Sequence, residues 1–480
     1  LTVSRNDFVN FNPPGIGIEP TEITNGLLRI NPLASLTFAG DLTDSENSPQ
    51  DALILTGVNT YTGGTDVVSS MLQIGDGTNN GQIGSGTTNI ASGATLNFNV
   101  KTGTTANYLS SNTFTGTGTL QKTGAGGLTW SSASAVFGMT GGLIDVQAGI
   151  FTGASGNNEI WTNNKASLNV ATGATFQGVE GNIIVDALTG GGAVSSGWGG
   201  LAYGFTVGVN GGSGTFSGAI QDANGQAAKL TKLGTGIQIL TGNNTYTGTT
   251  TISAGVLQVG NGGTTGNLGT GAVIDNAALV FNRSNALTVS NAISGTGTLT
   301  QSGTGTTILT GTNTYSGTTT LSTGILQVGN GGTSGTLGTG AVVNNTHLVF
   351  NRSNALLVSG AISGTGTLTQ MGSGTSTLAA DNTYAGTTTV SGGTLQVGNG
   401  GSTGTLGAGD VTLSNNATLS YVRSASTTIA NTISGAGNVS ANITGAASDL
   451  TVNSSINLTG GKANLVTDGN LLVKQAVSTT

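Results

Sequence analysis

The stretch Asn244-Thr-Tyr-Thr-Gly-Thr-Thr-Thr-Ile-Ser-Ala-Gly-Val-Leu-Gln-Val-Gly-Asn-Gly262 decides the fold, because close copies of it occur four times in the chain. The tyrosines of the four copies are Tyr61, Tyr246, Tyr315 and Tyr384. The last three are equally spaced, since the numbering advances by 69 from Tyr246 to Tyr315 and again from Tyr315 to Tyr384. Self-similarity at a fixed period predicts that successive segments stack on one another as structural repeats.

The composition indicates an all-β chain. With 85 glycines in 480 residues and only 6% charged residues, helices are disfavoured, because glycine destabilises helix interiors and few charges are present to solvate a helix face. Disorder is also disfavoured, since 35% of the residues are apolar. The chain has no cysteine, which excludes a disulfide framework.

Charge and hydropathy limit the partners. The formal charge of −7 and the pI near 4.5 oppose binding to nucleic acid or to anionic membranes. No apolar run approaches the roughly 18 to 20 residues that a membrane-spanning helix needs, so we expect no membrane insertion by this segment. Leu1 opens no positively charged signal region, and we therefore expect a mature or excised segment whose targeting parts lie outside it.

Within the repeat, apolar and polar residues alternate with period two. Leu257 and Val259 point to one side and Gln258 to the other, as in a strand. Each such strand carries only two or three inward side chains between glycines, so no strand can bury its face alone. A coil in which equivalent strands stack in parallel would let each strand bury its apolar face against the next turn. Division of the period by three predicts a right-handed parallel β-helix, or β-solenoid, with about 23 residues per turn and a super-repeat of three turns.

The regularity of the repeat predicts five segments. Residues 1–36 contain most of the prolines and are expected to form an arm or cap, and residues 37–123 hold the first repeat unit. Residues 124–204 are expected to form degenerate turns that contain all the tryptophans. The regular array covers residues 205–443, and residues 444–480 form the terminal turns.

The run Leu230-Thr-Lys-Leu-Gly-Thr-Gly, followed by the stretch that begins near Leu240 and ends at Val259, resembles the autotransporter-associated β-strand repeat, also called the passenger-associated transport repeat. The similarity covers roughly residues 36–123 and 205–443. In that family the repeat marks secreted passenger regions that fold as right-handed parallel β-helices and often belong to large adhesins or surface fibres. The resemblance therefore implies an extracellular or bacterial cell-surface location.

These observations predict a structural β-solenoid that acts as an adhesin stalk, an extracellular matrix component or a fibre subunit. Its expected partners are other copies of itself, joined head to tail or laterally, or surface glycans. A polysaccharide-binding or polysaccharide-cleaving β-helix is one alternative, and a passive scaffold for missing flanking domains is another. No catalytic residue is assigned, because the acidic residues of the array do not recur at equivalent positions, as clustered carboxylate chemistry would need. These residues are Asp222, Asp275, Asp381 and Asp410.

One acidic segment is a candidate cation site. Four carboxylates lie close together in sequence at Asp41, Asp44, Glu46 and Asp51. They could hold Ca²⁺, which takes oxygen ligands, although a solvated acidic loop is the favoured interpretation. No other cofactor is expected. The Gly-Asn-Gly-Gly loops that begin at residues 260, 329 and 398 lack the aspartate of calcium-binding repeats, so their glycines are expected to serve turns.

Three arginines recur at one position of the repeat, namely Arg283, Arg352 and Arg423. If the super-repeat has three whole turns, they form a row at a spacing of about 14 Å. Such a row could bind an acidic glycan or a neighbouring solenoid. Alternatively, each guanidinium caps a turn by donating hydrogen bonds to backbone carbonyls.

Aromatic residues are the last candidates. Trp130, Trp161 and Trp198 could form platforms on which sugars stack, or they could fill the wider core of irregular turns. Trp198, between two glycines, is the one we expect to be exposed. His347 is replaced by Ala278 and Thr418 in the neighbouring copies, which predicts a solvent-facing strand position rather than a ligand or base.

Overall fold

The computed structural model describes residues 2–3, 36–38, 52–130, 133–154, 159–161, 163–178, 181–196 and 204–480. These ranges contain strands and turns and no helix, and the strand pairings are parallel, so the prediction of an all-β parallel solenoid is confirmed. The chain forms two compact units, which are described separately. The first holds residues 1–255 and 266–270, and the second holds residues 256–265 and 271–480. The predicted segment boundaries stay predictions.

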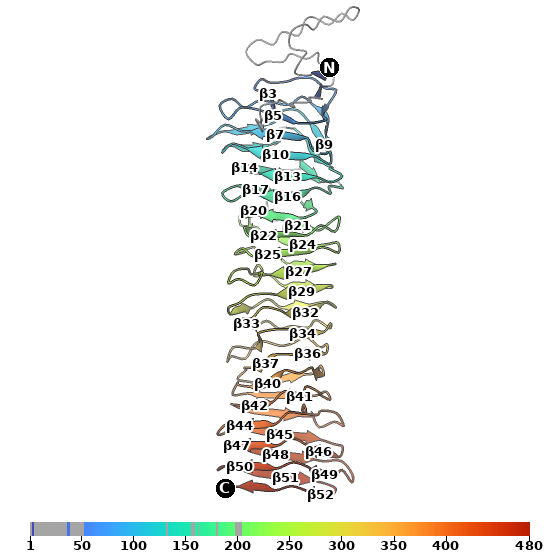
Figure 1. The fold of residues 1–480 in the computed structure, drawn as a ribbon, viewed down its shortest axis with the longest axis vertical. Helices are drawn as coiled ribbons and strands as arrows, with labels where there is room; N and C mark the ends of the chain where they lie inside the picture. The colour runs from blue at the N-terminus through green and yellow to red at the C-terminus, as the bar shows by residue number, and fades with distance from the viewer. Residues whose placement is uncertain are drawn as a thin grey trace, which may run out of the picture. The chain divides into compact units, whose positions relative to one another are not determined.

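Each turn of the first unit contributes strands to parallel sheets on different sides of the coil (Figure 1). One sheet consists of β1 (Thr2–Val3), β2 (Leu36–Phe38), β4 (Thr65–Val67), β6 (Gly86–Ile90), β9 (Asn112–Gly116), β12 (Ala135–Phe137) and β15 (Glu159–Trp161). A second contains β3 (Ala52–Leu55), β5 (Met71–Ile74), β7 (Thr95–Asn99), β10 (Thr119–Thr123), β13 (Leu143–Val146), β16 (Ser167–Val170), β19 (Leu188–Gly190), β22 (Gly214–Phe216) and β25 (Ile237–Leu240). A third consists of β8 (Thr105–Asn107), β11 (Gly127–Thr129), β14 (Ile150–Ala154), β17 (Thr175–Gly178), β20 (Ala193–Ser196) and β23 (Ala219–Asp222). Four further paired strands are β18 (Ile183–Val185), β21 (Gly204–Val207), β24 (Lys229–Lys232) and β26 (Thr250–Ile252).

Aromatic side chains fill the core of the first unit. Here Leu72 pairs with Leu96 and Leu96 with Leu120, so the numbering advances by 24 with each of these turns. The rings of Phe114 and Phe137 stack at 5.3 Å, and those of Phe137 and Trp161 at 4.6 Å. These long turns enclose an interior that small aliphatic side chains alone would leave underfilled, and voids in a close-packed core are costly.

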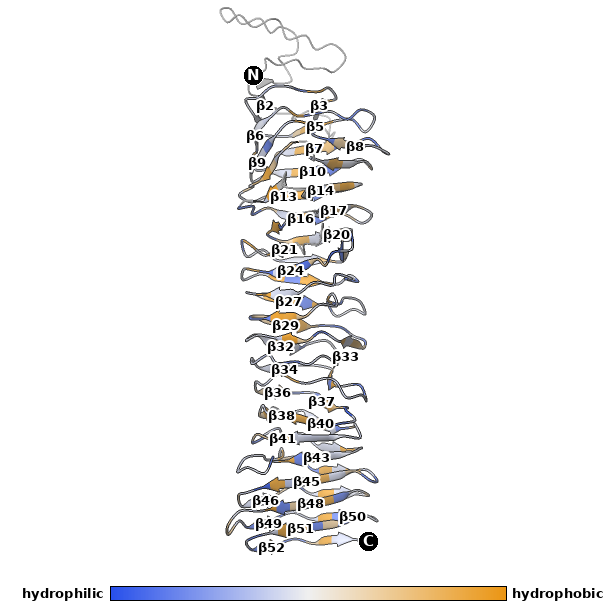
Figure 2. Ribbon diagram, turned by 180° about the vertical axis from the view of Figure 1, so that it is seen from behind, coloured by the Kyte–Doolittle hydropathy of each residue, from blue (hydrophilic) through white to orange (hydrophobic). Residues whose placement is uncertain are grey.

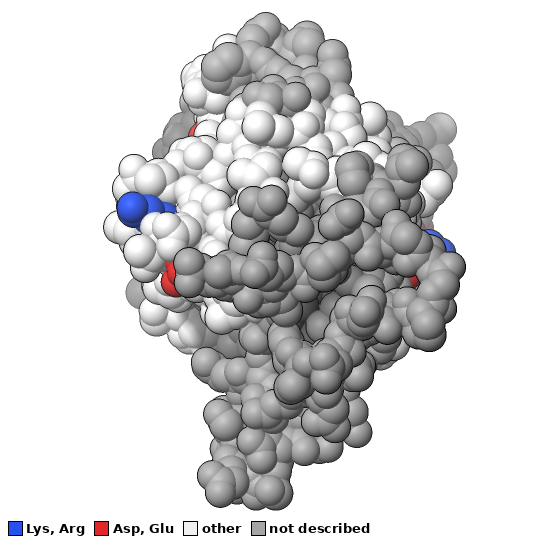
Figure 3. Space-filling model, turned by 90° about the horizontal axis from the view of Figure 1, so that it is seen from above, with Lys and Arg blue, Asp and Glu red and all other residues white. Residues whose placement is uncertain are grey.

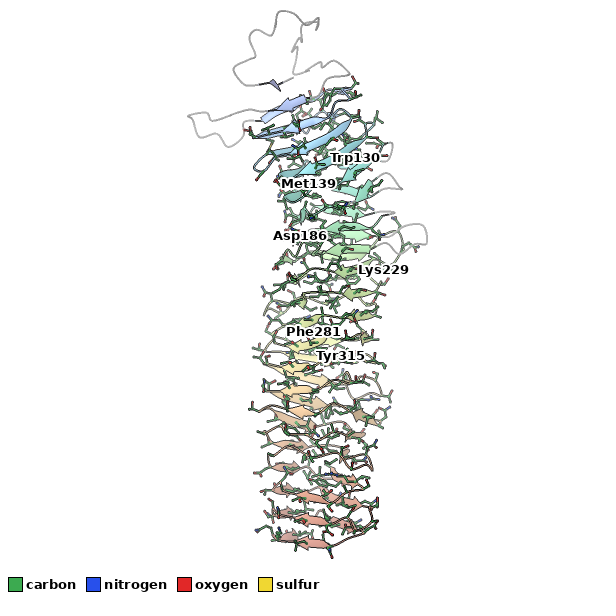
Figure 4. The ribbon with its side chains drawn as sticks, turned by 90° about the vertical axis from the view of Figure 1, so that its right-hand side faces the viewer. Trp130, Met139, Asp186, Lys229, Phe281 and Tyr315 are labelled. Carbon is green, nitrogen blue, oxygen red and sulfur yellow. The ribbon has the colours of Figure 1, made fainter. Side chains whose placement is uncertain are left out.

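Two of the three tryptophans belong to this core. Trp130 is fully buried and Trp161 is only 6% exposed, and Figure 4 places Trp130 within the stack of strands. They therefore fill the wider turns, and the sugar-stacking interpretation is wrong for both. Trp198 lies outside the described residues.

The second unit has the same construction. The sheet here called the β27 sheet holds β27 (Val256–Val259), β29 (Ala278–Phe281), β32 (Thr298–Gln301), β34 (Thr319–Leu321), β36 (Val342–Asn344) and β39 (Ile362–Ser363). The β30 sheet consists of β30 (Leu287–Val289), β33 (Thr306–Leu309), β35 (Ile325–Val328), β37 (His347–Phe350), β40 (Thr367–Gln370), β42 (Thr388–Val390), β44 (Val411–Leu413), β47 (Ile433–Gly435), β50 (Ile456–Leu458) and β53 (Val477–Thr479). The β38 sheet consists of β38 (Leu356–Val358), β41 (Thr375–Leu378), β43 (Thr394–Val397), β45 (Thr418–Arg423), β48 (Asn438–Ile443) and β51 (Ala463–Thr467). The remaining strands are the pair β28 (Val273–Asp275) and β31 (Ile293–Ser294), and the sheet of β46 (Thr427–Ile429), β49 (Leu450–Val452) and β52 (Leu471–Val473).

Inward and outward side chains alternate along these strands, as the period-two pattern predicts. In β27, Leu257 and Val259 are fully buried, whereas Val256 and Gln258 on the other face are half-buried. The same alternation recurs in β35 and β43. Figure 2 shows it as hydrophobic and hydrophilic colours that follow one another along single strands. The core of the unit is therefore a column of aliphatic and aromatic side chains that successive turns extend.

The register corrects the predicted super-repeat. Leu257 pairs with Leu279, Leu279 with Leu299, and Leu299 with Thr319, so three turns of the β27 sheet end well short of the next copy of the motif. The repeat partner of Leu257 is Leu326, which comes seven positions after Thr319 and lies in the β30 sheet. The next copy, Leu395, lies in the β38 sheet. One repeat unit therefore spans three turns and a third, not three, and the last three copies of the motif face three different sides of the coil.

The predicted turn length of 23 residues was wrong for a physical reason. The turn from Leu326 to Leu348 contains a Gly-Asn-Gly loop and is two positions longer than the next turn, which runs from Leu348 to Leu368. The motif appears only once in more than three turns, so the sequence displays the period of the repeat but not the length of a turn. The described part of the chain forms about 19 turns.

The offset of one third of a turn between successive copies predicts the effect of deletions. Removal of one whole repeat should preserve the stability of the array, whereas removal of three whole turns should not. Deletion of residues 315–383 joins two equivalent points of the motif, so each remaining turn keeps a matching neighbour. We expect the shortened chain to show the β-sheet circular dichroism and urea midpoint of the full chain. Deletion of residues 326–387, which removes three whole turns, joins unmatched parts of the motif and should lower the midpoint. Equal midpoints for the two deletions would contradict the offset.

Candidate functional site

The asparagine of the Asn-Thr-Tyr element joins three successive turns in the last three copies of the motif. The amide nitrogen of Asn313 donates to the carbonyl of Thr336 at 2.6 Å, and its side-chain oxygen accepts from the backbone N–H of Ile293 at 2.9 Å. Asn382 makes the same pair of bonds with Thr405 and Ile362. The partners of both asparagines are backbone groups of the neighbouring turns. These side chains are buried and satisfied, so they offer nothing to a ligand.

The tyrosine that follows is a core residue. Tyr315 is fully buried, and its hydroxyl lies 2.7 Å from the hydroxyl of Thr319. Figure 4 shows Tyr315 and Phe281 inside the stack. A side chain at Gly338 would place its Cβ 2.3 Å from the Tyr315 carbonyl and 2.6 Å from the ring. The glycine of the next turn is therefore required by the tyrosine, and the same pairing recurs in the other copies.

A buried lysine or glutamine closes a turn at another recurring position. Lys122 is 1% exposed, and its ammonium donates to the carbonyls of Thr123, Gly124 and Ala148 at 2.7 to 3.0 Å. Burial lowers the pKa of this group to about 8. Lys232 binds carbonyls in the same way, and in later copies Gln301 and Gln370 do so with an amide. Our sequence reasoning missed this role, although the pattern Leu-x-Lys/Gln-x-Gly repeats visibly.

The three repeated arginines cap the Gly-Asn-Gly-Gly loops. Arg352 is 8% exposed and donates from Nη1 to the carbonyl of Gly335 at 2.9 Å and from Nη2 to that of Thr333 at 2.6 Å. Its Nε donates to Oδ1 of Asn354 at 3.0 Å. Arg283 and Arg423 bind the corresponding loop carbonyls of Thr264 and Ser402. The turn-capping interpretation therefore describes what these side chains do in the structure.

The arginines do not form the predicted row. Arg283 and Arg352 come just after β29 and β37, and Arg423 is the last residue of β45; these strands belong to the β27, β30 and β38 sheets. The offset of a third of a turn thus places them on different sides of the coil. A binding role for Arg283, Arg352 and Arg423 stays a prediction, and any such site would have to use one arginine at a time.

A chain of polar side chains runs along the outside of the first unit. Asp145 is its centre, because it accepts from Gln121 at 2.9 Å on one side and from Asn169 at 2.7 Å on the other. Gln147 donates to both of its carboxylate oxygens. Three neutral amides thus satisfy one carboxylate, which makes Asp145 a structural acceptor in a continuous network.

Asp275 is a buried carboxylate at a position that Asn344 occupies in the next copy. Its Oδ1 accepts from the N–H of Ala277 at 3.1 Å, while Oδ2 is buried without a partner. Burial raises the pKa of Asp275 to about 6. Asn344 uses its amide nitrogen to donate to the carbonyl of Thr367 at 2.9 Å, a bond that an ionised carboxylate cannot make.

The remaining candidates are not brought together into a reactive site. Nε2 of His347 lies 2.8 Å from the hydroxyl of Thr369, and its half-buried ring lies on the outward face of β37, opposite the buried Leu348. Asp41, Asp44, Glu46 and Asp51 lie outside the described residues, so the Ca²⁺ site stays a prediction. Within the described ranges, no three acidic, histidine or cysteine side chains gather as metal ligands would. The glycines of the Gly-Asn-Gly-Gly loops do serve turns, since Gly260 and Gly262 both have φ near +79°.

The four copies of the motif match a known repeat. The passenger-associated transport repeat matches residues 51–70, 230–259, 299–328 and 368–397. The chain thus contains four copies of this repeat and is similar in this respect to autotransporter passenger proteins. Its location is accordingly extracellular or at the cell surface. The chain forms no helix in its described part that could span a membrane.

One curated protein adds to this assignment. The adhesin BmaC autotransporter of Brucella suis biovar 1 is 50% identical to this passenger-like protein over 58 residues. The match covers 12% of this chain and 2% of the length of that adhesin. No solved structure matches the chain.

Asp275→Asn should stabilise the passenger-like protein in a pH-dependent way. The folded-state pKa of Asp275 is raised, so the fold favours the protonated carboxyl, and its unfavourable contribution appears as the pH rises from about 4 through 6. The asparagine stays neutral and supplies the donor that Asn344 uses. We expect a gain of about 1 to 3 kcal/mol at pH 7, measured by urea unfolding, that disappears near pH 4. A gain of equal size at both pH values would contradict the explanation.

Ala425→Asn should stabilise the last arginine-capped loop. The Nε atom of Arg423 is buried without a partner, because Ala425 stands where the other copies have Asn285 and Asn354. An asparagine there should accept this donor and add about 1 kcal/mol to the free energy of unfolding. In an Arg423→Met background the same substitution should add nothing. A gain that persists in that background would show that the asparagine acts without the arginine.

Proposed function

We propose that this chain is a stalk segment of a secreted or surface-displayed bacterial adhesin, that it contributes to adhesion itself, and that it carries out no catalysis. The observation that supports the proposal most directly is the use of the repeated polar residues. The asparagines, glutamines, buried lysines and arginines of the repeat all bind backbone groups of their own or adjacent turns. Residues that recur through the array thus serve to hold one turn on the next, which is the task of a spacer.

The catalytic alternative finds little support in the described residues. Asp275 has an abnormal pKa, as catalytic carboxylates often do, but it is buried and hydrogen-bonded to its own turn. Asp222 accepts from the backbone N–H of Ala228 and from both the N–H and the hydroxyl of Thr247. Neither carboxylate is paired with another across a cleft, as glycoside hydrolysis requires.

The relative supports the adhesive part of the proposal. Its printed name describes it as an adhesin, and the likeness covers only a small part of it. A long adhesin needs a segment that holds its binding parts away from the cell, and stacked parallel turns supply length at about 4.8 Å per turn. Head-to-tail or lateral assembly, a role in a matrix or fibre, and a role as a scaffold for flanking domains stay predictions.

The proposal is tested with the purified chain on fluorescent beads. We expect coated beads to bind epithelial cells or bacterial surfaces more than albumin-coated beads do, and soluble chain should compete for the same sites. Incubation of the chain with soluble polysaccharides should release no reducing ends. Adhesion no better than that of albumin would overturn the adhesive role, and released reducing ends would favour the polysaccharide-cleaving alternative.

A further inference from the structure

Asp275 lies at a corner of the coil that the next turn covers. Its side chain points inward from the end of β28 and is fully buried. A Cβ built at Gly297 would lie 2.3 Å from Oδ1 of Asp275, and one built at Gly295 would lie 2.1 Å from its backbone carbonyl oxygen. The backbone of the next turn therefore lies directly on this residue and shields the carboxyl from water. We call residues 275–277 and 295–298 the Asp275 corner.

The next copy of the repeat has the same corner with an amide in place of the carboxyl. Asn344 stands at the position of Asp275, and in both residues Oδ1 accepts from the backbone N–H two residues further on. Nδ2 of Asn344 donates to the carbonyl of Thr367 at 2.9 Å. Asparagine and aspartate side chains have the same shape, so Oδ2 of Asp275 takes the place of a hydrogen-bond donor.

Protonation decides whether Asp275 satisfies this corner. From the position of Thr367 in the next copy, we expect the carbonyl of Thr298 to face Oδ2 of Asp275. A protonated carboxyl has an O–H group that can donate to this carbonyl, whereas an ionised carboxylate has only acceptors. Oδ2 is buried without a partner. Ionisation therefore leaves two acceptors against each other away from water, which disfavours the closed corner.

The groups around Asp275 do not neutralise its charge. Of the strands beside β28, β26 and β31 carry no titratable side chain. Tyr315, from a neighbouring corner, has a pKa that is raised by burial and also by the charge of Asp275. Its phenol therefore stays neutral over the pH range in which a carboxyl titrates. Among the described residues, no cation is paired with Asp275.

The later copies of the repeat avoid a charge at this position. The residue is Asn344 in one copy and Leu413 in the next, and both are buried. Other carboxylates of the chain differ from Asp275, because Asp145 accepts from three amides and Asp222 from two N–H groups and a hydroxyl. The combination of burial, an unpartnered oxygen and no cation is thus a feature of the Asp275 corner.

We propose that the Asp275 corner is a proton-dependent conformational switch, which is closed while the carboxyl is protonated and opens locally to water when it ionises. Opening stays local because each turn contacts only its neighbours. The segment that moves includes Gly295, whose φ of +105° shows the conformational freedom of glycine. The inference does not depend on the proposed adhesive function.

The pH range of the switch follows from the two states of the carboxyl. Burial raises the pKa of Asp275 to about 6 in the closed corner, whereas an exposed carboxyl has a pKa near 4. Because the closed state has the higher pKa, it is most favoured below about pH 4. Its advantage is lost progressively as the pH rises through 6 and then levels off. The corner therefore opens between mildly acidic and neutral pH.

The test is hydrogen–deuterium exchange of the full chain, followed by mass spectrometry at pH 4 and pH 8, with exchange times corrected for the intrinsic rates. We compare peptides that cover residues 273–298 with peptides that cover residues 342–367. Protection of the first region should fall on the order of 50-fold from pH 4 to pH 8, and protection of the second should not change.

Two reciprocal variants and a control assign the effect. Asp275→Asn should remove the pH dependence at residues 273–298. Asn344→Asp places the same carboxyl in the equivalent corner, and residues 342–367 should then lose protection at pH 8. Asp145→Asn removes a carboxylate that is already satisfied and should leave the response at residues 273–298 intact.

Three results would overturn the inference. The first is equal protection of residues 273–298 at pH 4 and pH 8 in the unchanged chain. The second is a pH response that persists in Asp275→Asn. The third is a loss of protection at pH 8 that extends through the whole second unit, because the opening would then not be local. If Asn344→Asp does not fold at pH 8, exchange at pH 4 should still show a protected corner, and its absence there would also contradict the switch.

Discussion

Parallel pairing between successive turns is the constraint on which this structure depends. A parallel register places each inward residue on the inward residue of the next turn, as Leu348 lies on Leu326 and under Leu368. Each strand has only two to six residues, so no turn has a core of its own. Every turn gains its buried surface and its backbone hydrogen bonds from its neighbours, which is why stability in such a protein is a property of adjacent turns.

The polar residues of the repeat follow from this constraint. Where the chain bends between sheets, backbone carbonyls and N–H groups point away from any strand partner, and leaving them buried and unpaired would be costly. Asn313, Gln301 and Arg352 each bind such groups at a different corner. The few charged residues serve the same purpose in several places, and the end of the molecule in Figure 3 shows correspondingly little charge among its described residues.

The sequence predicted the fold class and the period of the repeat, because alternation and self-similarity are local features. It did not predict that each of the last two copies is displaced by one third of a turn from the copy before it. The motif occurs only once in more than three turns, so the length of a single turn cannot be read from its spacing. The arginines illustrate the consequence. Their recurrence was visible, but the predicted row was wrong because Arg283, Arg352 and Arg423 lie at the ends of strands in three different sheets. The partners of Asp145 and Lys122 were invisible as well, because they depend on which residues of neighbouring turns stand in register.

The displacement also affects the mechanics of the array. A repeat of whole turns would place every irregularity, such as a protruding loop or a longer turn, on the same side, and their small distortions would add up to a curve. In the second unit, the loops after β27, β35 and β43 leave from three sides in succession. A bend that one copy introduces toward one side is then opposed by the bends that the next two copies introduce toward the other two sides. The mismatch between the length of a repeat and the length of a turn thus keeps such distortions from accumulating on one side of the second unit.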